Sequence, residues 1–218
     1  MSPRLLQKSL PLYDSPVTLG LQTITGQVHF DSHVTTTVEV VVALVNALAT
    51  AEAGGRPAVS PAGPEQVRAR AEGALREAGA RRAEVGVDEA AGLQRLAGRL
   101  REVFAALAEG REDDAAGIIN VLLAQSGARP HLHRHQPAPW HLHFHPPEAG
   151  PVEGWTAGCA TGLAHALGSE HAARLGTCAA PACERVFVDV SRNGSRRFCN
   201  TACQNRVKAA THRARGGR

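Results

Sequence analysis

The sequence predicts an α+β protein in which a mostly helical N-terminal domain with a small β-hairpin precedes a treble-clef-like zinc finger made of a hairpin and a helix. Three observations predict this fold class. Apolar residues recur at helical spacing in the first 170 residues, polar and apolar residues alternate over 131–145, and two cysteine pairs lie near the C-terminus. We expect an N-terminal arm (1–25), a helical α+β domain (26–170) and a finger with its basic tail (176–218).

The first elements are predicted from spacing and from turn residues. Residues 26–33 are expected to form a short strand or an extended entry. A helix is predicted over 35–48, with a strand as the alternative because its valines are β-branched. The Gly/Pro/Ala-rich segment 51–64 predicts a loop, and the Ala/Arg/Glu-rich segment 65–80 predicts a helix.

Two later helices are expected to form the heart of the core. The first is predicted to begin with Asp88 as its N-cap and to end near Gly110. Asp113 or Asp114 is expected to cap the second, and a further helix is predicted over 154–167. The two apolar stripes that would pack together are Leu93, Leu96, Leu100, Val103 and Leu107, and Ile118, Ile119, Leu122 and Leu123.

Composition and charge restrict the functional classes. No apolar run is long enough for a signal sequence or a membrane span, so we expect a cytoplasmic protein without a membrane partner. In a reducing compartment, five cysteines favour metal ligation over disulfides. Eight of the 24 basic residues and none of the 20 acidic ones lie in 191–218, so the rest of the chain carries about −4. This basic end predicts a polyanionic partner.

The cysteine spacing predicts one structural zinc ion. Four residues separate Cys178 from Cys183, three separate Cys199 from Cys203, and fifteen lie between the pairs. Thiolates at this spacing suit a tetrahedral Zn²⁺ site better than magnesium or calcium, which prefer oxygen. A zinc site contributes ~10–16 kcal/mol in finger peptides, which this apolar-poor segment needs. The alternative is four small buried residues, the role we expect for Cys159.

A hairpin is predicted between the cysteine pairs and a helix after them. Residues 186–190 predict a strand, Asn193-Gly194 is a turn signal, and 196–198 would return to the second pair. Asn200 or Thr201 is expected to cap the helix, which would run to about residue 213.

Basic side chains of this hairpin and helix are the candidates for phosphate contacts, which give salt-dependent affinity. They are Arg192, Arg196, Arg197, Arg206, Lys208, Arg213 and Arg215. Asn205, with Gln204 or Asn193, is the candidate for reading base edges. The alternatives are a solvated basic tail, a tail that binds an acidic face of the same protein, and a bond from Arg196 or Arg197 to Asp189.

Six histidines alternate along a second predicted hairpin, with Leu132 opposite Leu142 or Phe144. They are His131, His133, His135, His141, His143 and His145. His141 and His143 are the first candidates for a ligand or metal site. The competing interpretation is an exposed polar face, because no carboxylate lies within the segment to orient the rings.

Four C-terminal sequence motifs resemble the CGNR zinc fingers of bacterial stress-associated transcription regulators. They are Cys178–Cys183, Val186–Asp189, Ser191–Cys199 and Cys203-Gln204-Asn205-Arg206, with Gln in place of the family's Gly. The upstream region is similar to the ABATE domain that accompanies this finger, in Phe30-Asp31-Ser32, Leu44-Val45-Asn46, Leu100–Phe104 and Trp140–His143.

The resemblance implies zinc binding and a transcription regulator. We therefore expect a non-enzymatic protein whose N-terminal domain senses a signal or binds a partner and whose finger binds nucleic acid, DNA in the first place. A homodimer is left open. The alternatives are a protein-interaction module with a purely structural finger, and a metal-dependent enzyme that uses the histidines.

Overall fold

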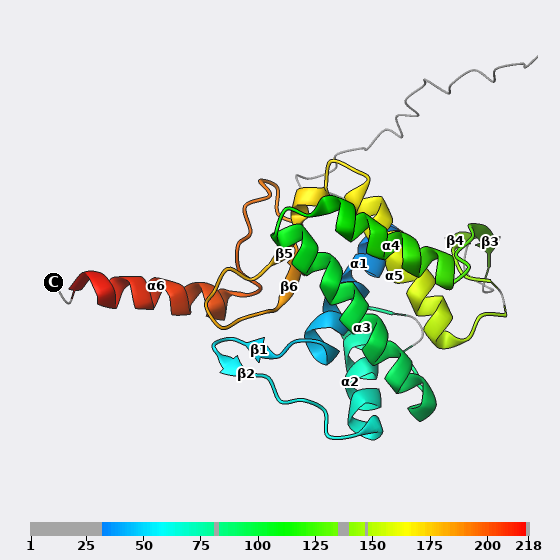
Figure 1. Cartoon of the computed structure of the whole chain (residues 1–218), viewed down its shortest axis with the longest axis horizontal. Coiled ribbons are helices and arrows are strands. Elements are labelled where there is room, and N and C mark those ends of the chain that lie inside the picture. Colours follow the sequence, from blue (N-terminus) through cyan, green and yellow to red (C-terminus); the bar gives the residue numbers. More distant parts are fainter. Residues whose placement is uncertain (1–31, 81–82, 135–139, 147, 217–218) are drawn as a thin grey trace, which may run out of the picture.

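The computed structural model describes residues 32–80, 83–134, 140–146 and 148–216. The predicted arm (1–25) lies outside the described residues, as does most of the predicted strand at 26–33, whose last two residues begin the first helix. The helices of the body are α1 (Ser32–Leu48), α2 (Pro64–Glu77), α3 (Val87–Ala108), α4 (Glu112–Gln125) and α5 (Pro151–Leu167). The finger ends in α6 (Thr201–Gly216), which extends away from the body in Figure 1.

Helix α1 is the centre of the core. It contacts α2, α3 and α5, and α4 completes the bundle against α3 and α5. Its valines and leucines are buried around most of its circumference, which is typical of a helix enclosed by other elements. The segment 35–48 is therefore helical, and the alternative of a strand is wrong, because packing outweighs the weak helix propensity of valine.

Two of the predicted helix caps are wrong. Helix α3 begins one residue before Asp88 and has Gly86 at its N-cap, whose N–H donates to the Glu89 carboxylate at 2.7 Å. Helix α4 begins at Glu112 after Arg111, so Asp113 and Asp114 lie in its first turn. Carboxylates are stabilised anywhere in a first turn by the helix dipole, so their presence does not fix the cap.

The packing predicted for α3 and α4 is confirmed. Leu93, Leu100 and Val103 are fully buried, as is Phe104, and Ile119 of α4 packs in the same cluster. Helix α5 begins at Pro151, three residues earlier than the predicted start at 154. No helix in the described part of the chain is long and apolar enough to cross a membrane.

Three small antiparallel hairpins complete the fold. Strands β1 (Glu52–Ala53) and β2 (Arg56–Pro57) lie within the segment predicted as a loop, and Gly54 and Gly55 between them have φ of 62° and 88°. Positive φ at both central residues is the geometry of a tight hairpin turn that favours glycine. In β3 (His131–His133) and β4 (His141–His143), Leu132 pairs with Leu142, as predicted, and not with Phe144.

The hairpin of the finger is not the one that the sequence predicted. Strand β6 (Val186–Val188) pairs with β5 (Leu175–Thr177), which precedes the first cysteine, and residues 196–198, the predicted return, form no strand. Burial explains this choice: Leu175, Val186 and Val188 join the main hydrophobic core against α1 and α3, whereas the returning Arg-Arg segment is exposed. The finger is thus attached to the helical body through a shared core.

Candidate metal centre

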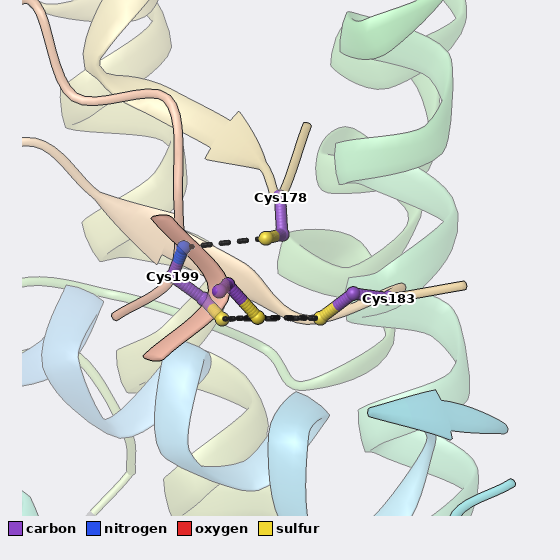
Figure 2. Close-up of side chains that lie close together, drawn as sticks. Cys178, Cys183 and Cys199 are labelled. Atoms are coloured by element: carbon purple, nitrogen blue, oxygen red, sulfur yellow. Dashed lines mark hydrogen bonds between the residues drawn. The ribbon is translucent and has the colours of Figure 1, made fainter. Parts of the chain in front are cut away.

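Four sulfur atoms converge between the β5–β6 hairpin and the start of α6 (Figure 2). The Sγ atoms of Cys183, Cys199 and Cys203 lie 3.7–3.8 Å apart, and all four sulfurs lie within 4.8 Å of one another. Four sulfurs bound tetrahedrally to zinc at about 2.3 Å stand about 3.8 Å apart. The geometry therefore fits one zinc ion held by Cys178, Cys183, Cys199 and Cys203.

Each cysteine pair is positioned by a local turn. Cys178 follows β5, and the connection to β6 turns at Ala182, a non-glycine residue with φ of 51°. Cys199 lies just before α6, and its N–H donates to Cys178 Sγ at 3.4 Å. Asn200 is the cap of α6, as predicted, because its side-chain oxygen accepts the Cys203 N–H at 2.9 Å. Gln204 lies in regular helix, so the family's glycine is not needed for a turn here.

Burial and crowding oppose the ionisation of two of the four thiols, those of Cys199 and Cys203. Burial raises the pKa of Cys199, and the neighbouring sulfurs raise it further. Burial raises the pKa of Cys203 as well. At Cys183 burial also acts to raise the pKa, but hydrogen bonds from backbone N–H groups of Gly54 and Arg185 outweigh it, and the pKa falls to about 7. Cys183 is therefore easier to ionise than Cys199 or Cys203, and a bound zinc ion would stabilise the thiolate form of its ligands.

The β1–β2 turn of the helical domain supports the first cysteine pair. Besides the bond from Gly54 to Cys183, the Gly55 N–H donates to the Ala182 carbonyl at 2.8 Å, and the Glu184 N–H donates to the Glu52 carbonyl at 2.9 Å. Backbone donors to a ligand sulfur orient it and stabilise its thiolate. The sequence predicted a loop over 51–64 but not its contact with the finger, since the two are more than 120 residues apart in the chain.

A second polar contact joins the finger to α1. The Asn46 amide donates to the Val186 carbonyl at 3.0 Å and accepts the Val186 N–H at 2.9 Å, so it pairs with the free edge of β6. Arg101 of α3 forms an ion pair with Glu184 at 3.0 Å. The signal in the sequence was a single amide in the otherwise apolar second half of α1, and spacing alone does not show where such an amide bonds.

Arg206 is a structural residue of the finger as well as a predicted phosphate ligand. Its Nη2 donates to the Pro181 carbonyl at 2.7 Å, which ties α6 to the turn between the first two cysteines. A Cβ added to Gly55 would lie 2.8 Å from Arg206 Nη1, so the β1–β2 turn packs directly on this guanidinium.

Asp189 organises the loop that returns to the second cysteine pair. Its carboxylate accepts the N–H of Ser191 at 2.8 Å and the N–H of Arg196 at 2.7 Å. Burial acts to raise the pKa of Asp189, but these hydrogen bonds and the charge of Arg174 lower it below its usual value. Arg196 is held too: its guanidinium donates to the carbonyls of Val188, Phe198 and Cys199. The bond to Asp189 that the sequence suggested is thus made by the Arg196 backbone.

The other basic candidates are exposed on the finger. Arg192 and Arg197 lie on the loop, with the Arg197 guanidinium 5.9 Å from the centre of the Phe198 ring, and α6 carries the rest. The exposed candidates on α6 are Asn205, Lys208, Arg213 and Arg215. They are brought to one end of the molecule, and their contacts with nucleic acid stay predictions.

The described histidine candidates lie on or next to the β3–β4 hairpin. This hairpin lies at the opposite end of the molecule from α6 in Figure 1. His143 lies on β4 opposite His131, and its ring contacts three other imidazoles. His141 lies opposite His133, and its side chain is outside the described residues, as is His135. Cys159 is buried in α5, and burial raises its pKa to about 12, consistent with the packing role predicted for it.

Comparison with known proteins identifies the finger. No curated protein matches the chain. The resemblance of the upstream region to an ABATE domain stays a prediction. The family model of the CGNR zinc finger matches residues 174–216, the segment that contains all four converging cysteines, so this part of the chain is a zinc finger that binds one structural zinc ion.

Proposed function

We propose that this chain is a non-enzymatic cytoplasmic regulator that binds nucleic acid, DNA in the first place, through α6 and the adjoining loop of its zinc finger. The observation that carries the proposal is the exposure of a helix with basic residues and no acidic one. From Ser191 to the C-terminus the sequence has no Asp or Glu. Within the described residues, α6 buries only Cys203. Such an unneutralised basic surface attracts phosphates.

One face of α6 is the favoured interface. Gln204, Lys208, Thr211 and Arg215 follow one another at helical spacing, so they share a side of the helix. They line a shallow groove of about 370 Å³ together with Phe198, Val207 and His212. Along this face the amide of Gln204 and the hydroxyl of Thr211 alternate with the cations of Lys208 and Arg215. Such a set combines phosphate contacts with hydrogen-bonding groups for bases.

Arg196 and Arg206 make a smaller contribution in this proposal than the sequence suggested. Both guanidinium groups donate to carbonyls of the finger itself, and these bonds hold the loop and the first cysteine turn in place. Replacing either would disturb the zinc site, so a loss of binding in such a variant would not report on phosphate contacts. Lys208 and Arg215 are the cleaner residues to test.

The helical domain would act as the receiver of a signal or partner. The support is its rigid connection to the finger: β1–β2, Asn46 and Arg101 all contact the segment between Ala182 and Val186. A ligand or partner that shifted these elements would move the turn that contains Cys183. This connection favours a regulator over two independent modules joined by a linker.

The test is a polarisation titration with labelled duplex DNA and single-stranded RNA over a series of salt concentrations. We expect affinity that falls with salt, and we expect the double variant Lys208→Ala/Arg215→Ala to reduce the slope of log K against log salt on duplex DNA by about 2, since each phosphate contact contributes about 0.9. The matched control is Arg95→Ala/Arg129→Ala, which removes the same charge from exposed positions of the helical body.

Two outcomes would overturn the proposal. The first is no salt-dependent binding to either nucleic acid by zinc-loaded protein. The second is equal loss in the test and control variants, which would indicate attraction by net charge alone. Either outcome would remove the role of α6 in binding nucleic acid. If binding is found, the DNA and RNA arms show which nucleic acid is preferred.

A further inference from the structure

A cluster of histidine side chains lies on and next to the β3–β4 hairpin. This hairpin lies at the opposite end of the molecule from α6 of the finger (Figure 1). The strand register places His131 opposite His143, and alternate residues of a strand share a face. The leucines Leu132 and Leu142 between them lie on the other face, where both are exposed. The hairpin thus separates its imidazoles from its apolar side chains.

The spacing of the rings fits a shared metal ion. The centroid of the His143 ring lies 5.7 Å from the ring centroid of His131, 5.0 Å from that of His145 and 5.3 Å from that of His133. His131 and His145 are 5.9 Å apart. Two imidazoles on one tetrahedral zinc, with nitrogens at about 2.0–2.1 Å from the ion, have centroids about 5 Å apart. The backbone therefore holds these rings close enough for side-chain rotation to bring their nitrogens onto one ion.

Backbone carbonyls orient two of the rings. His145 Nδ1 lies 2.9 Å from the Pro146 carbonyl, and His131 Nδ1 lies 3.5 Å from the Arg129 carbonyl. A carbonyl acceptor places the proton of a neutral imidazole on Nδ1 and leaves the lone pair on Nε2. Metal-binding histidines are commonly oriented by a carboxylate or a backbone carbonyl in this way. The lack of a carboxylate in the segment is thus no argument against a metal site.

We propose that His131, His143 and His145 bind a divalent transition metal ion, with His133 as the candidate fourth ligand. Imidazole nitrogen suits Zn²⁺, Ni²⁺ and Cu²⁺. Unlike the four sulfurs, the ring nitrogens in the described residues do not form a group within 4.8 Å, so binding requires the rings to turn about their Cα–Cβ bonds. The bond between His143 Nδ1 and His145 Nε2, 3.1 Å long, would be exchanged for bonds to the metal.

The experiment is calorimetric titration of the full-length, zinc-loaded protein with Ni²⁺, using protein from which any polyhistidine tag has been removed. We expect one equivalent of Ni²⁺ to bind while the zinc content, measured separately by mass spectrometry of the elements, stays constant. The variant His131→Gln/His143→Gln/His145→Gln should lose this binding step. The control variant His165→Gln/His212→Gln, which changes exposed histidines of α5 and α6, should retain it.

A second measurement uses the unmodified protein and needs no variant. Ni²⁺ is paramagnetic, so it broadens the imidazole signals of the histidines that bind it in the NMR spectrum of the unmodified protein. We expect selective broadening at His131, His143 and His145, and at His133, whose ring lies next to that of His143. Absence of Ni²⁺ binding, broadening at His165 or His212 without broadening on the hairpin, or equal binding by the triple variant with an unchanged circular dichroism spectrum would overturn the proposal. None of these outcomes depends on nucleic-acid binding.

Discussion

The helical core and the zinc finger of this protein are stabilised by different forces. Around α1 the buried residues are almost all aliphatic or aromatic, and they come from the helices α1–α5, the connection before α3 and the β5–β6 hairpin. In the finger beyond β5, the second buried cluster is made of Cys178, Ala180, Cys183 and Cys203. Among the described residues, the partly buried hydrophobic ones that pack against it are Phe198, Cys199 and Val207.

This difference predicts that each region is sensitive to a different kind of change. The core loses stability when apolar volume is removed, because burial of that volume is what holds its elements together. The finger loses its structure when the metal is removed, because its small cluster cannot offset the entropy of ordering the chain. The β5–β6 hairpin belongs to both regions, since its strands pack in the main core and the two cysteines between them bind zinc.

The largest effect is expected from zinc removal. Chelation at neutral pH should release residues 178–185 and the first turns of α6, while α1 and α3 stay folded, because a structural zinc contributes about 10–16 kcal/mol to finger peptides. Hydrogen exchange followed by mass spectrometry checks this through peptides from the two regions. Equal loss of protection in α3 and in the finger would show that the two regions do not differ in this way.

A core substitution is expected to destabilise the helical core and to leave the zinc site intact. Leu100 is fully buried in α3, so Leu100→Ala should lower the free energy of unfolding by about 2–5 kcal/mol through lost burial and a residual cavity. The folded variant should still bind zinc with unchanged stoichiometry, because Leu100 belongs to the main core and not to the cysteine cluster. Chemical denaturation combined with metal analysis measures both quantities, and loss of zinc from the folded variant would contradict the comparison.

A smaller effect is expected at the contact between the regions. Asn46→Ala leaves the N–H and carbonyl of Val186 without their side-chain partner and should cost about 1–3 kcal/mol. The matched control is Asn120→Ala, an exposed amide of α4 that should change stability far less. Chemical denaturation of both variants distinguishes them. An equal effect would mean that the Asn46 amide does not stabilise the β6 edge.

The smallest effect is expected at the turn that supports Cys183. Gly54 and Gly55 both have positive φ, so alanine at either costs roughly 1–2 kcal/mol in backbone strain. A Cβ at Gly55 would also meet the Arg206 guanidinium, whereas a Cβ at Gly54 would meet nothing within 4 Å. We therefore expect Gly55→Ala to weaken zinc retention in a competition with a chelator and Gly54→Ala to weaken it less. Equal zinc retention by the two variants would show that the Arg206 guanidinium moves away from a Cβ at residue 55 without weakening the zinc site.

The sequence revealed much of this structure, for identifiable reasons. Helical spacing found the α3–α4 contact, and ligand spacing found the four cysteines, because both patterns depend on neighbours along the chain. The pairing of β6 with β5 was missed because the Asn193-Gly194 signal indicates a turn but not which strands pair. The roles of Asn46, Gly54 and Gly55 depend on contacts more than 120 residues away, which no local pattern contains.

The zinc content of the purified protein decides whether the four cysteines hold a zinc ion. After washing with imidazole, which competes with histidine for metal ions, the unmodified chain should retain one zinc ion, and Cys203→Ser should retain none under the same conditions. Protein that holds no zinc after expression in zinc-supplemented medium would contradict the account. So would a Cys203→Ser variant that retains zinc as firmly as the unmodified chain.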